Sequence, residues 1–340
     1  MTPRKKLSEQ RKRLLGRERA VILEMKNQYG KVWTSINTEL THLAAQIKAA
    51  KAAGESINAT WLLKQRRLES VVRTAAAEIR VLVDLLDKTI TDAQMTAAFE
   101  GRMDAAELIR ESMGVSPGGG MFDPVIPRLV PEKLIERVAA GSALSKRLEA
   151  LGADAVREVK QGLLRGLLLG KNPREVARGI AEALNGNRWR ANVIARTEML
   201  GVYREAAAAS YKANDVVTGW TWLSARNTRT CSVCWSKDGS LHKDSEVLAS
   251  HPCCRCSMQP RTKTWEELGF KGIPETSPPR TRGADVFARL SPADQRKILG
   301  PGKFDLYKSG KLKLSDLPVK TRSEFGPGLR QRSLKELRAR

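Results

Sequence analysis

Cysteine and histidine are almost absent from this chain of 340 residues. All five cysteines lie between Cys231 and Cys256, and only three histidines occur, at His42, His242 and His251. Cysteines confined to one short segment do not cross-link a whole fold, so this pattern excludes a disulfide framework spread along the chain. In a reducing cytoplasm, clustered cysteines are more often metal ligands than disulfides.

Long apolar runs and aromatic side chains are also scarce. Runs such as Leu167–Leu169 are far too short to cross a bilayer, and no apolar segment follows the charged N-terminus as a secretory signal requires. We therefore expect a protein that is made in the cytoplasm and has no membrane segment. Aromatic residues make up 5% of the chain, too few to indicate recognition of single strands by base stacking.

Acidic residues are too few to balance the basic ones. The chain has 60 lysines and arginines against 37 aspartates and glutamates, a formal net charge of +23. Such an excess predicts attraction to a polyanion, and nucleic acid is the first candidate. The excess is strongest at the two ends of the chain, a pattern that is also typical of solvated basic tails. The end residues that we expect to contact DNA without sequence specificity are Arg4, Lys5, Lys6, Arg11, Lys12, Arg13, Arg330, Arg332 and Arg338.

Apolar residues recur every three or four positions between residues 20 and 110, the pattern of two helices packed along a narrow seam. The break between Gly54 and Asn58 predicts a turn, and Ser56 or Asn58 would cap the second helix. We therefore expect an antiparallel helical hairpin, which is either ordinary core or an arm that docks on a partner. The seam residues are Tyr29, Trp33, Ile36, Leu40, Leu43 and Ile47 in the first helix, and Leu68, Val72, Ala75, Ile79, Leu82 and Leu86 in the second.

Beyond the hairpin, the pattern is again helical up to about residue 214. Asn172-Pro173 predicts the start of one helix, with Gly186 near its end. The alternation from Val216 to Trp222 then predicts a short strand that leads into the cysteine segment, and a short helix is expected at residues 292–299. The fold class is therefore mainly α, with helical hairpin or bundle regions and a small α+β cysteine-rich module.

Two segments rich in proline and glycine divide the chain. We expect these segments to be linkers between folded regions. The predicted organisation is a basic N-terminal arm and helical hairpin at 1–115, a linker at 116–131, a helical domain at 132–270 that contains the cysteine-rich module (216–262), a second linker at 271–283, and a basic C-terminal tail region at 284–340.

The cysteine segment reads C-S-V-C, then a spacer, then H-P-C-C-R-C. Zinc takes four sulfur or nitrogen ligands tetrahedrally, and Cys231 and Cys234 form the natural first pair. A set rich in thiolates favours a structural zinc over a catalytic one. A reduced thiol cluster held by packing, or a disulfide formed in an assembled particle, are the alternatives. Spacing leaves the second pair open between Cys253 with Cys256, His251 with Cys254, and Cys254 with Cys256.

The sequence gives little support for an enzyme. A metal-dependent nuclease built on the cluster would need several histidines, and His242 or His251 would have to serve. Asp238-Gly239 indicates a tight turn rather than an acid catalyst. The glycines at 118–120 lack the Lys-Ser/Thr of a phosphate-binding loop. We therefore expect no catalytic residues.

Several stretches taken in order resemble the Mu F-like family of phage head-morphogenesis proteins, the minor capsid proteins of tailed phages. The resemblance covers roughly residues 135–262. It is carried by Ile194-Ala195-Arg196-Thr197-Glu198, Tyr203-Arg204-Glu205-Ala206, Gly219-Trp220-Thr221-Trp222, Arg229-Thr230-Cys231-Ser232-Val233-Cys234, Lys237-Asp238-Gly239 and His251-Pro252-Cys253-Cys254-Arg255-Cys256.

The family pattern H-P-x-C-R-C makes Cys253 the extra cysteine. The resemblance therefore implies zinc bound by Cys231, Cys234, Cys254 and Cys256, with His251 as a substitute for one of them. It also implies a protein of head assembly, bound at the portal vertex inside the capsid of the virion and present in the host cytoplasm during assembly. Its partners would be the portal protein, capsid and scaffolding proteins, and packaged double-stranded DNA.

Two further classes remain as alternatives. One is a metal-dependent nuclease or a DNA-binding protein built on the Cys/His cluster. The other is an effector delivered by the virion. The resemblance implies this class, because some members of the family carry an attached toxin or ADP-ribosyltransferase domain. The last 80 residues of this chain are too short and too basic for such a domain.

Overall fold

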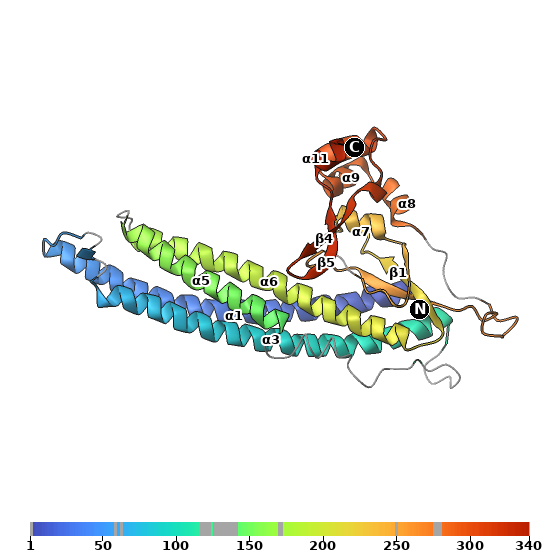
Figure 1. Cartoon of the computed structure of the whole chain (residues 1–340), viewed down its shortest axis with the longest axis horizontal. Helices are drawn as coiled ribbons and strands as arrows, with labels where there is room; N and C mark the ends of the chain where they lie inside the picture. The colour runs from blue at the N-terminus through green and yellow to red at the C-terminus, as the bar shows by residue number, and fades with distance from the viewer. Residues whose placement is uncertain are drawn as a thin grey trace. The chain divides into compact units, whose positions relative to one another are not determined.

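The computed structural model describes residues 3–57, 60–61, 64–115, 124, 142–168, 173–248, 251–274 and 281–339. The predicted linker at 116–131 lies outside the described residues except for Pro124, and so do residues 275–280 of the second linker and Asn58, one of the two expected caps. The fold is mainly helical, as predicted. Its long helices are α1 (Pro3–Ala52), α3 (Arg66–Met113), α5 (Ala143–Leu168) and α6 (Pro173–Lys212) (Figure 1).

The chain forms two compact units. The first, here called the bundle unit, comprises Arg17–Ala93 and Glu136–Glu198. The second, the sheet unit, comprises Met1–Gly16, Gln94–Ile135 and Met199–Arg340. Each unit has its own buried core.

The predicted hairpin is present in the bundle unit, where α1 and α3 run antiparallel. Gln28 Nε2 donates to Thr89 Oγ1 at 3.2 Å, whereas Ser70 Oγ donates to Glu39 Oε2 at 3.1 Å. A later residue of α1 thus pairs with an earlier residue of α3, so the two helices run in opposite directions. In the sequence, Trp61 and Gln65 lie between α1 and α3. Gln46 Nε2 of α1 donates a hydrogen bond to Gln65 Oε1 at 2.7 Å.

The buried seam differs from the predicted one at two positions. Val32 and Val71 are the buried residues, where the sequence pattern had indicated Trp33 and Val72, which are only half-buried. The other ten predicted seam residues are buried. A straight α-helix has 3.6 residues per turn rather than 3.5, so heptad spacing does not fix which of two adjacent residues faces the partner helix. At the first position, the smaller side chain of Val32 suits a tightly packed seam better than that of Trp33.

Helices α5 and α6 complete the bundle unit. Asn187 of α6 donates to the Leu151 carbonyl at 2.9 Å and accepts from Tyr29 Oη at 2.6 Å, so one buried amide joins three helices. Helix α6 begins at Pro173 as expected, but it does not end near Gly186 and continues to Lys212. A glycine inside a helix costs only about 1 kcal/mol relative to alanine, and tertiary packing readily offsets this.

The sheet unit contains a three-stranded antiparallel sheet of order β2-β1-β3. Its strands are β1 (Val217–Leu223), β2 (Leu241–His242) and β3 (Ser257–Thr262), and β1 confirms the predicted strand. Gly219 has a φ of 153°, and a Cβ there would lie 2.3 Å from the His242 carbonyl oxygen, so only glycine fits this crossing. Trp220 and Trp222 of β1 are buried in the core, together with Tyr211 of α6 and Ile109 of α3.

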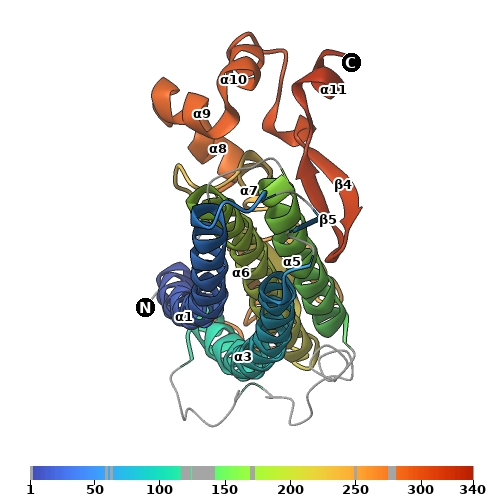
Figure 2. The same ribbon diagram turned by 90° about the vertical axis from the view of Figure 1, so that its left-hand side faces the viewer.

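Residues 283–338, in the region where the sequence predicts a basic tail, fold around a second core in the sheet unit. Trp235, Phe287, Leu299, Phe304 and Leu317 form its centre. These elements are coloured orange to red in Figure 2. They are α8 (Gly283–Ala288), α9 (Pro292–Leu299), α10 (Pro301–Lys308), the 3₁₀ turn η1 (Leu314–Asp316), β4 (Pro318–Ser323), β5 (Gly326–Gln331) and α11 (Leu334–Arg338). Helix α9 matches the predicted short helix.

Among the described residues, no helix is both long enough and apolar enough to cross a membrane.

Candidate metal centre

The first half of the centre is built on the short helix α7 (Ser232–Lys237). Cys231 caps this helix, because its sulfur accepts from the backbone N–H of Cys234 at 3.4 Å. A C-x-x-C sequence across the start of a helix brings both sulfurs to the same end of it. Cys234 is buried and Cys231 is half-buried.

The second half lies on the segment that enters β3. The backbone turns at His251, whose carbonyl accepts from Cys254 N at 3.2 Å. The buried guanidinium of Arg204, on α6, donates to the carbonyl of Cys254 and, at 3.2 Å, to that of Cys256. These bonds fix the backbone that carries two of the cysteines. The sequence did not indicate this role for Arg204, because the two segments lie about fifty residues apart.

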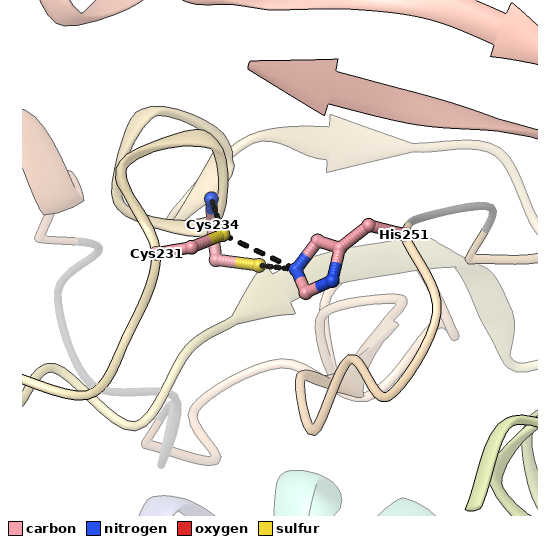
Figure 3. A group of neighbouring side chains, drawn as sticks. All are labelled: Cys231, Cys234 and His251. Atoms are coloured by element: carbon pink, nitrogen blue, oxygen red, sulfur yellow. Dashed lines mark hydrogen bonds between the residues drawn. The ribbon is translucent and has the colours of Figure 1, made fainter. Parts of the chain in front are cut away.

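The two halves meet at short distances (Figure 3). His251 Nε2 lies 3.1 Å from Cys231 Sγ and 3.3 Å from Cys234 Sγ, and Cys234 Sγ lies 3.6 Å from Cys254 Sγ. A tetrahedral zinc ion with bonds of about 2.3 Å to sulfur and about 2.0–2.1 Å to nitrogen requires donors roughly 3.5–3.8 Å apart. These three donor pairs therefore need to move by only a few tenths of an ångström to reach the spacing that zinc requires.

Five donors gather here, in two overlapping groups. Cys231, Cys234 and His251 form one, and Cys234, Cys254 and Cys256 form the other, with the donor atoms of each within 4.8 Å of one another. Cys234 belongs to both. All five metal residues expected from the sequence are thus brought together. Cys253 is in neither group, and its φ of 59° marks a sharp turn of the chain.

The environment of these donors favours the charged forms of Cys231, Cys254 and His251, whereas hydrogen bonds within the cluster and burial raise the pKa of Cys234 and that of Cys256. Hydrogen bonds from Cys234 and then from His251 lower the pKa of Cys231 to about 5. Hydrogen bonds from Cys234 and Cys256 hold the pKa of Cys254 well below its usual range. Burial opposes protonation of His251, yet its bonds to Cys231 and Cys254 outweigh burial and raise its pKa to about 11. Two of the sulfurs thus favour the thiolate, the form that binds metal.

The other end of α7 belongs to the C-terminal core. Trp235 is fully buried, and its ring meets that of Phe287 edge-on, with centroids 5.6 Å apart. After the helix, Asp238-Gly239 makes the predicted turn. The buried Asp238 carboxylate accepts from Ser224 N at 2.7 Å and pairs with Arg226 Nε at 2.5 Å, and its backbone carbonyl accepts from Gly283 N at 2.8 Å.

His242 and His42 lie apart from this arrangement. The His242 ring stacks on Trp220 with centroids 4.1 Å apart, and its two nitrogens are 2.9 Å from Glu246 Oε2 and 2.9 Å from Ser240 Oγ. Both ring nitrogens therefore have protein partners. His42 is an exposed residue of α1, 4.0 Å from Glu39. The geometry thus favours a structural role for His242.

The basic residues expected to contact DNA at the N-terminus lie on the first turns of α1 rather than in an extended arm. Lys6 pairs with Glu107, and Arg13 pairs with the buried Asp104. Arg11 donates to the Leu223 carbonyl at 3.3 Å and to Ser257 Oγ at 3.4 Å. Three of the predicted contacts therefore anchor α1 within the sheet unit. The exposed residues among the six are Arg4, Lys5, Lys12 and Arg13.

The predicted C-terminal contacts are similarly divided. Arg330 pairs with Glu336 at 2.5 Å, and Arg332 Nε donates to the Asp316 carbonyl at 3.0 Å. Arg338 is exposed on α11. Much of the basic charge at the two ends of the chain thus serves the fold.

Part of the chain matches a known protein family. Residues 157–259 match the family described as Phage Mu protein F like protein, which confirms the predicted resemblance over this segment, a little under a third of the chain. The segment runs from α5 through α6 and β1 into β3, and it contains all five candidate donors.

A curated relative is the NAD(+)--arginine ADP-ribosyltransferase EFV of Enterococcus faecalis. It is 26% identical over 192 residues, which are 56% of this chain and 38% of that protein. The chain therefore spans well under half the length of that relative. No solved structure matches the chain.

Proposed function

Because residues 157–259 are Mu F-like, we propose that this protein is a minor head protein of a tailed phage that acts in head morphogenesis. The match over the cysteine module is the observation that carries this proposal. It supports a structural protein of the virion, with phage structural proteins as its partners.

Within the virion, the proposed position is the portal vertex inside the capsid, in contact with packaged DNA. The net charge of +23 supports this position, since lysines and arginines that neutralise phosphates release bound counterions. Binding of this kind is insensitive to base sequence and weakens as salt rises. Portal, capsid and scaffolding proteins are the proposed protein partners.

The proposed cofactor is one structural zinc ion at the Cys/His cluster. Three thiols and either His251 or Cys256 provide a closed set of four soft donors, which leaves no open position for water. When bound, zinc supplies a cross-link between α7 and the segment that enters β3. The chain's own contribution is to gather these donors within 4.8 Å of one another in each group and to bury three of the sulfurs, those of Cys234, Cys254 and Cys256.

An enzymatic role is not part of the proposal. The ADP-ribosyltransferase relative is 38% covered by this chain, so its activity does not transfer with the similarity. The nuclease alternative requires a free histidine near the cluster, and both nitrogens of His242 are engaged elsewhere. His251 is itself one of the five metal donors.

The test is to mix the purified full-length chain with the portal protein of its own phage and to weigh the complexes by native mass spectrometry. We expect a defined complex with about one zinc per chain. Cys231→Ser/Cys254→Ser, which leaves three of the five donors, should lose the zinc, whereas Cys253→Ser, the control outside both donor groups, should keep it. A chain that binds no portal, or that cleaves DNA in a divalent metal, would overturn the head-assembly proposal. Unchanged metal content in the double variant would overturn the zinc assignment alone.

A further inference from the structure

A large cavity lies within the sheet unit, and none of the five candidate metal donors lines it. Its volume is about 1080 Å³. Its lining comes from Ser236 and residues 238–241, at the end of α7 and in the turn into β2, and from α8, α10 and the segment 312–315. Cavities that hold ligands are typically ~300–1,000 Å³, so the space is large enough for an extended ligand that lies partly in solvent.

Three cations from separate segments line this cavity. Arg282 precedes α8, Lys308 ends α10, and Lys313 precedes η1. Asp238 is the acidic residue among the lining side chains, and its carboxylate is already paired with Arg226. The cavity therefore presents an uncompensated positive charge.

These cations lack the ion pairs that engage several cations near the ends of the chain. Lys6, Arg13 and Arg330 each form an ion pair with a carboxylate. Arg282, Lys308 and Lys313 are exposed, and no ion pair within the described part of the chain engages them. Their charge is thus available to a ligand.

The remaining polar groups suit phosphate rather than a nucleobase. The hydroxyls of Ser236 and Ser315 also line the cavity and are donors that a phosphate oxygen accepts. Tyr307 is the aromatic residue of the lining, and its ring already meets Phe287 edge-on, with centroids 5.4 Å apart. The described lining of the cavity therefore has no free aromatic ring on which a base could stack.

We propose that this cavity binds the phosphodiester backbone of double-stranded DNA, through Arg282, Lys308 and Lys313. This inference rests on the proposed contact with packaged DNA and names the surface that makes it. The contact is independent of base sequence, because phosphate contacts position the nucleic acid without reading its bases.

The experiment compares two full-length triple variants. Arg282→Gln/Lys308→Gln/Lys313→Gln removes the cavity cations. Its control, Arg289→Gln/Lys320→Gln/Arg322→Gln, removes three exposed cations of the same C-terminal region that do not line the cavity. Both lose the same net charge, so a nonspecific effect of charge weakens both equally.

Affinity for a fluorescent duplex is measured by anisotropy over a range of NaCl concentrations, after circular dichroism has verified folding. Each lost phosphate contact reduces the slope of log K against log salt by about 0.9, so the cavity variant should lose up to about 2.7 in slope. It should also bind at least roughly tenfold more weakly at the lowest salt. The control should keep most of the wild-type slope.

Equal weakening of both variants would overturn the cavity assignment and leave the proposed DNA contact standing. A wild-type chain that binds no duplex would overturn both. Binding of inorganic pyrophosphate to wild type and to the cavity variant is measured as a third comparison. If pyrophosphate binds wild type but not the cavity variant, while both bind duplex equally, the cavity takes a small phosphate and not the DNA backbone.

Discussion

Arg226 and Asp238 form a buried ion pair, with Arg226 Nε 2.5 Å from Asp238 Oδ2. The Asp238 side chain is fully buried and that of Arg226 is 12% exposed. Arg226 also donates to the Thr281 carbonyl at 2.6 Å, so the pair links the loop after β1, the end of α7 and the start of the C-terminal core. Arg226 itself has a φ of 50°, a conformation that a non-glycine residue adopts only where its surroundings fix it.

Asp238→Asn should strongly destabilise the sheet unit. The change leaves the Arg226 guanidinium without its charge partner in a buried place, and breaking such a pair typically costs about 3–5 kcal/mol. The measurement is urea unfolding, followed by tryptophan fluorescence.

Asp285→Asn is the control for this substitution, since Asp285 is exposed on α8. It should leave the unfolding midpoint nearly unchanged. Equal midpoints for the two variants would show that the Arg226–Asp238 pair does not hold the fold.

Ile36→Ala should destabilise the hairpin of the bundle unit. Ile36 is fully buried, and truncation of such a side chain leaves a cavity that typically costs about 2–5 kcal/mol. Leu23→Ala, at a position 57% exposed on the same helix, should cost far less. Thermal unfolding by circular dichroism compares the two, and similar melting temperatures would contradict the observed seam.

Arg204→Met should weaken metal binding without removing a ligand. The two carbonyls that Arg204 satisfies, at Cys254 and Cys256, would lose their charged donor, so the backbone of this segment would no longer be fixed. Loss of a group that orients metal ligands typically costs about 10–100-fold in metal affinity. Competition with a chromophoric zinc chelator measures this change.

Arg255→Met serves as the comparison for Arg204→Met, because Arg255 is exposed in the same segment. Its zinc affinity should stay within a few-fold of wild type. If Arg204→Met binds zinc as tightly as this control, the carbonyl contacts do not position the ligands.

If the proposed zinc is bound, its removal should loosen the C-terminal core as well as the cysteine segment. Helix α7 carries Cys234 toward the cluster and Trp235 into the core with Phe287. Hydrogen exchange after chelation should therefore increase in α7 and α8. Exchange in α1 residues 25–47 should not change. If hydrogen exchange in α8 is unchanged by chelation, the C-terminal core does not depend on the metal.

The elements with strong local signals could be predicted from the sequence. The hairpin, the strand at Trp220–Trp222 and the helix at Pro292–Leu299 each follow from periodicity or from a proline after a capping serine. The phase of the hairpin seam was wrong at Trp33 and Val72, because two heptads do not fix which of two adjacent apolar residues faces inward.

The sequence predicted which cysteines and histidine lie together in the candidate site, but not the residues that support them. The five candidate donors follow from spacing and from the family pattern. The bonds from Arg204 and the Arg226–Asp238 pair join segments distant in the chain, and no local pattern indicates them. For the same reason, the sequence could not show that Arg11 and Arg13 are used within the fold.

Helix α7 has six residues, too few to be stable alone in water. Its two faces serve different neighbours, the cysteine cluster through Cys231 and Cys234 and the C-terminal core through Trp235. Changes in either neighbour therefore act on the same six residues, and their effects on folding should not add. In a diverging lineage, a substitution accepted around Phe287 would depend on what the cysteine segment already carries, so the two parts of the sequence should change together.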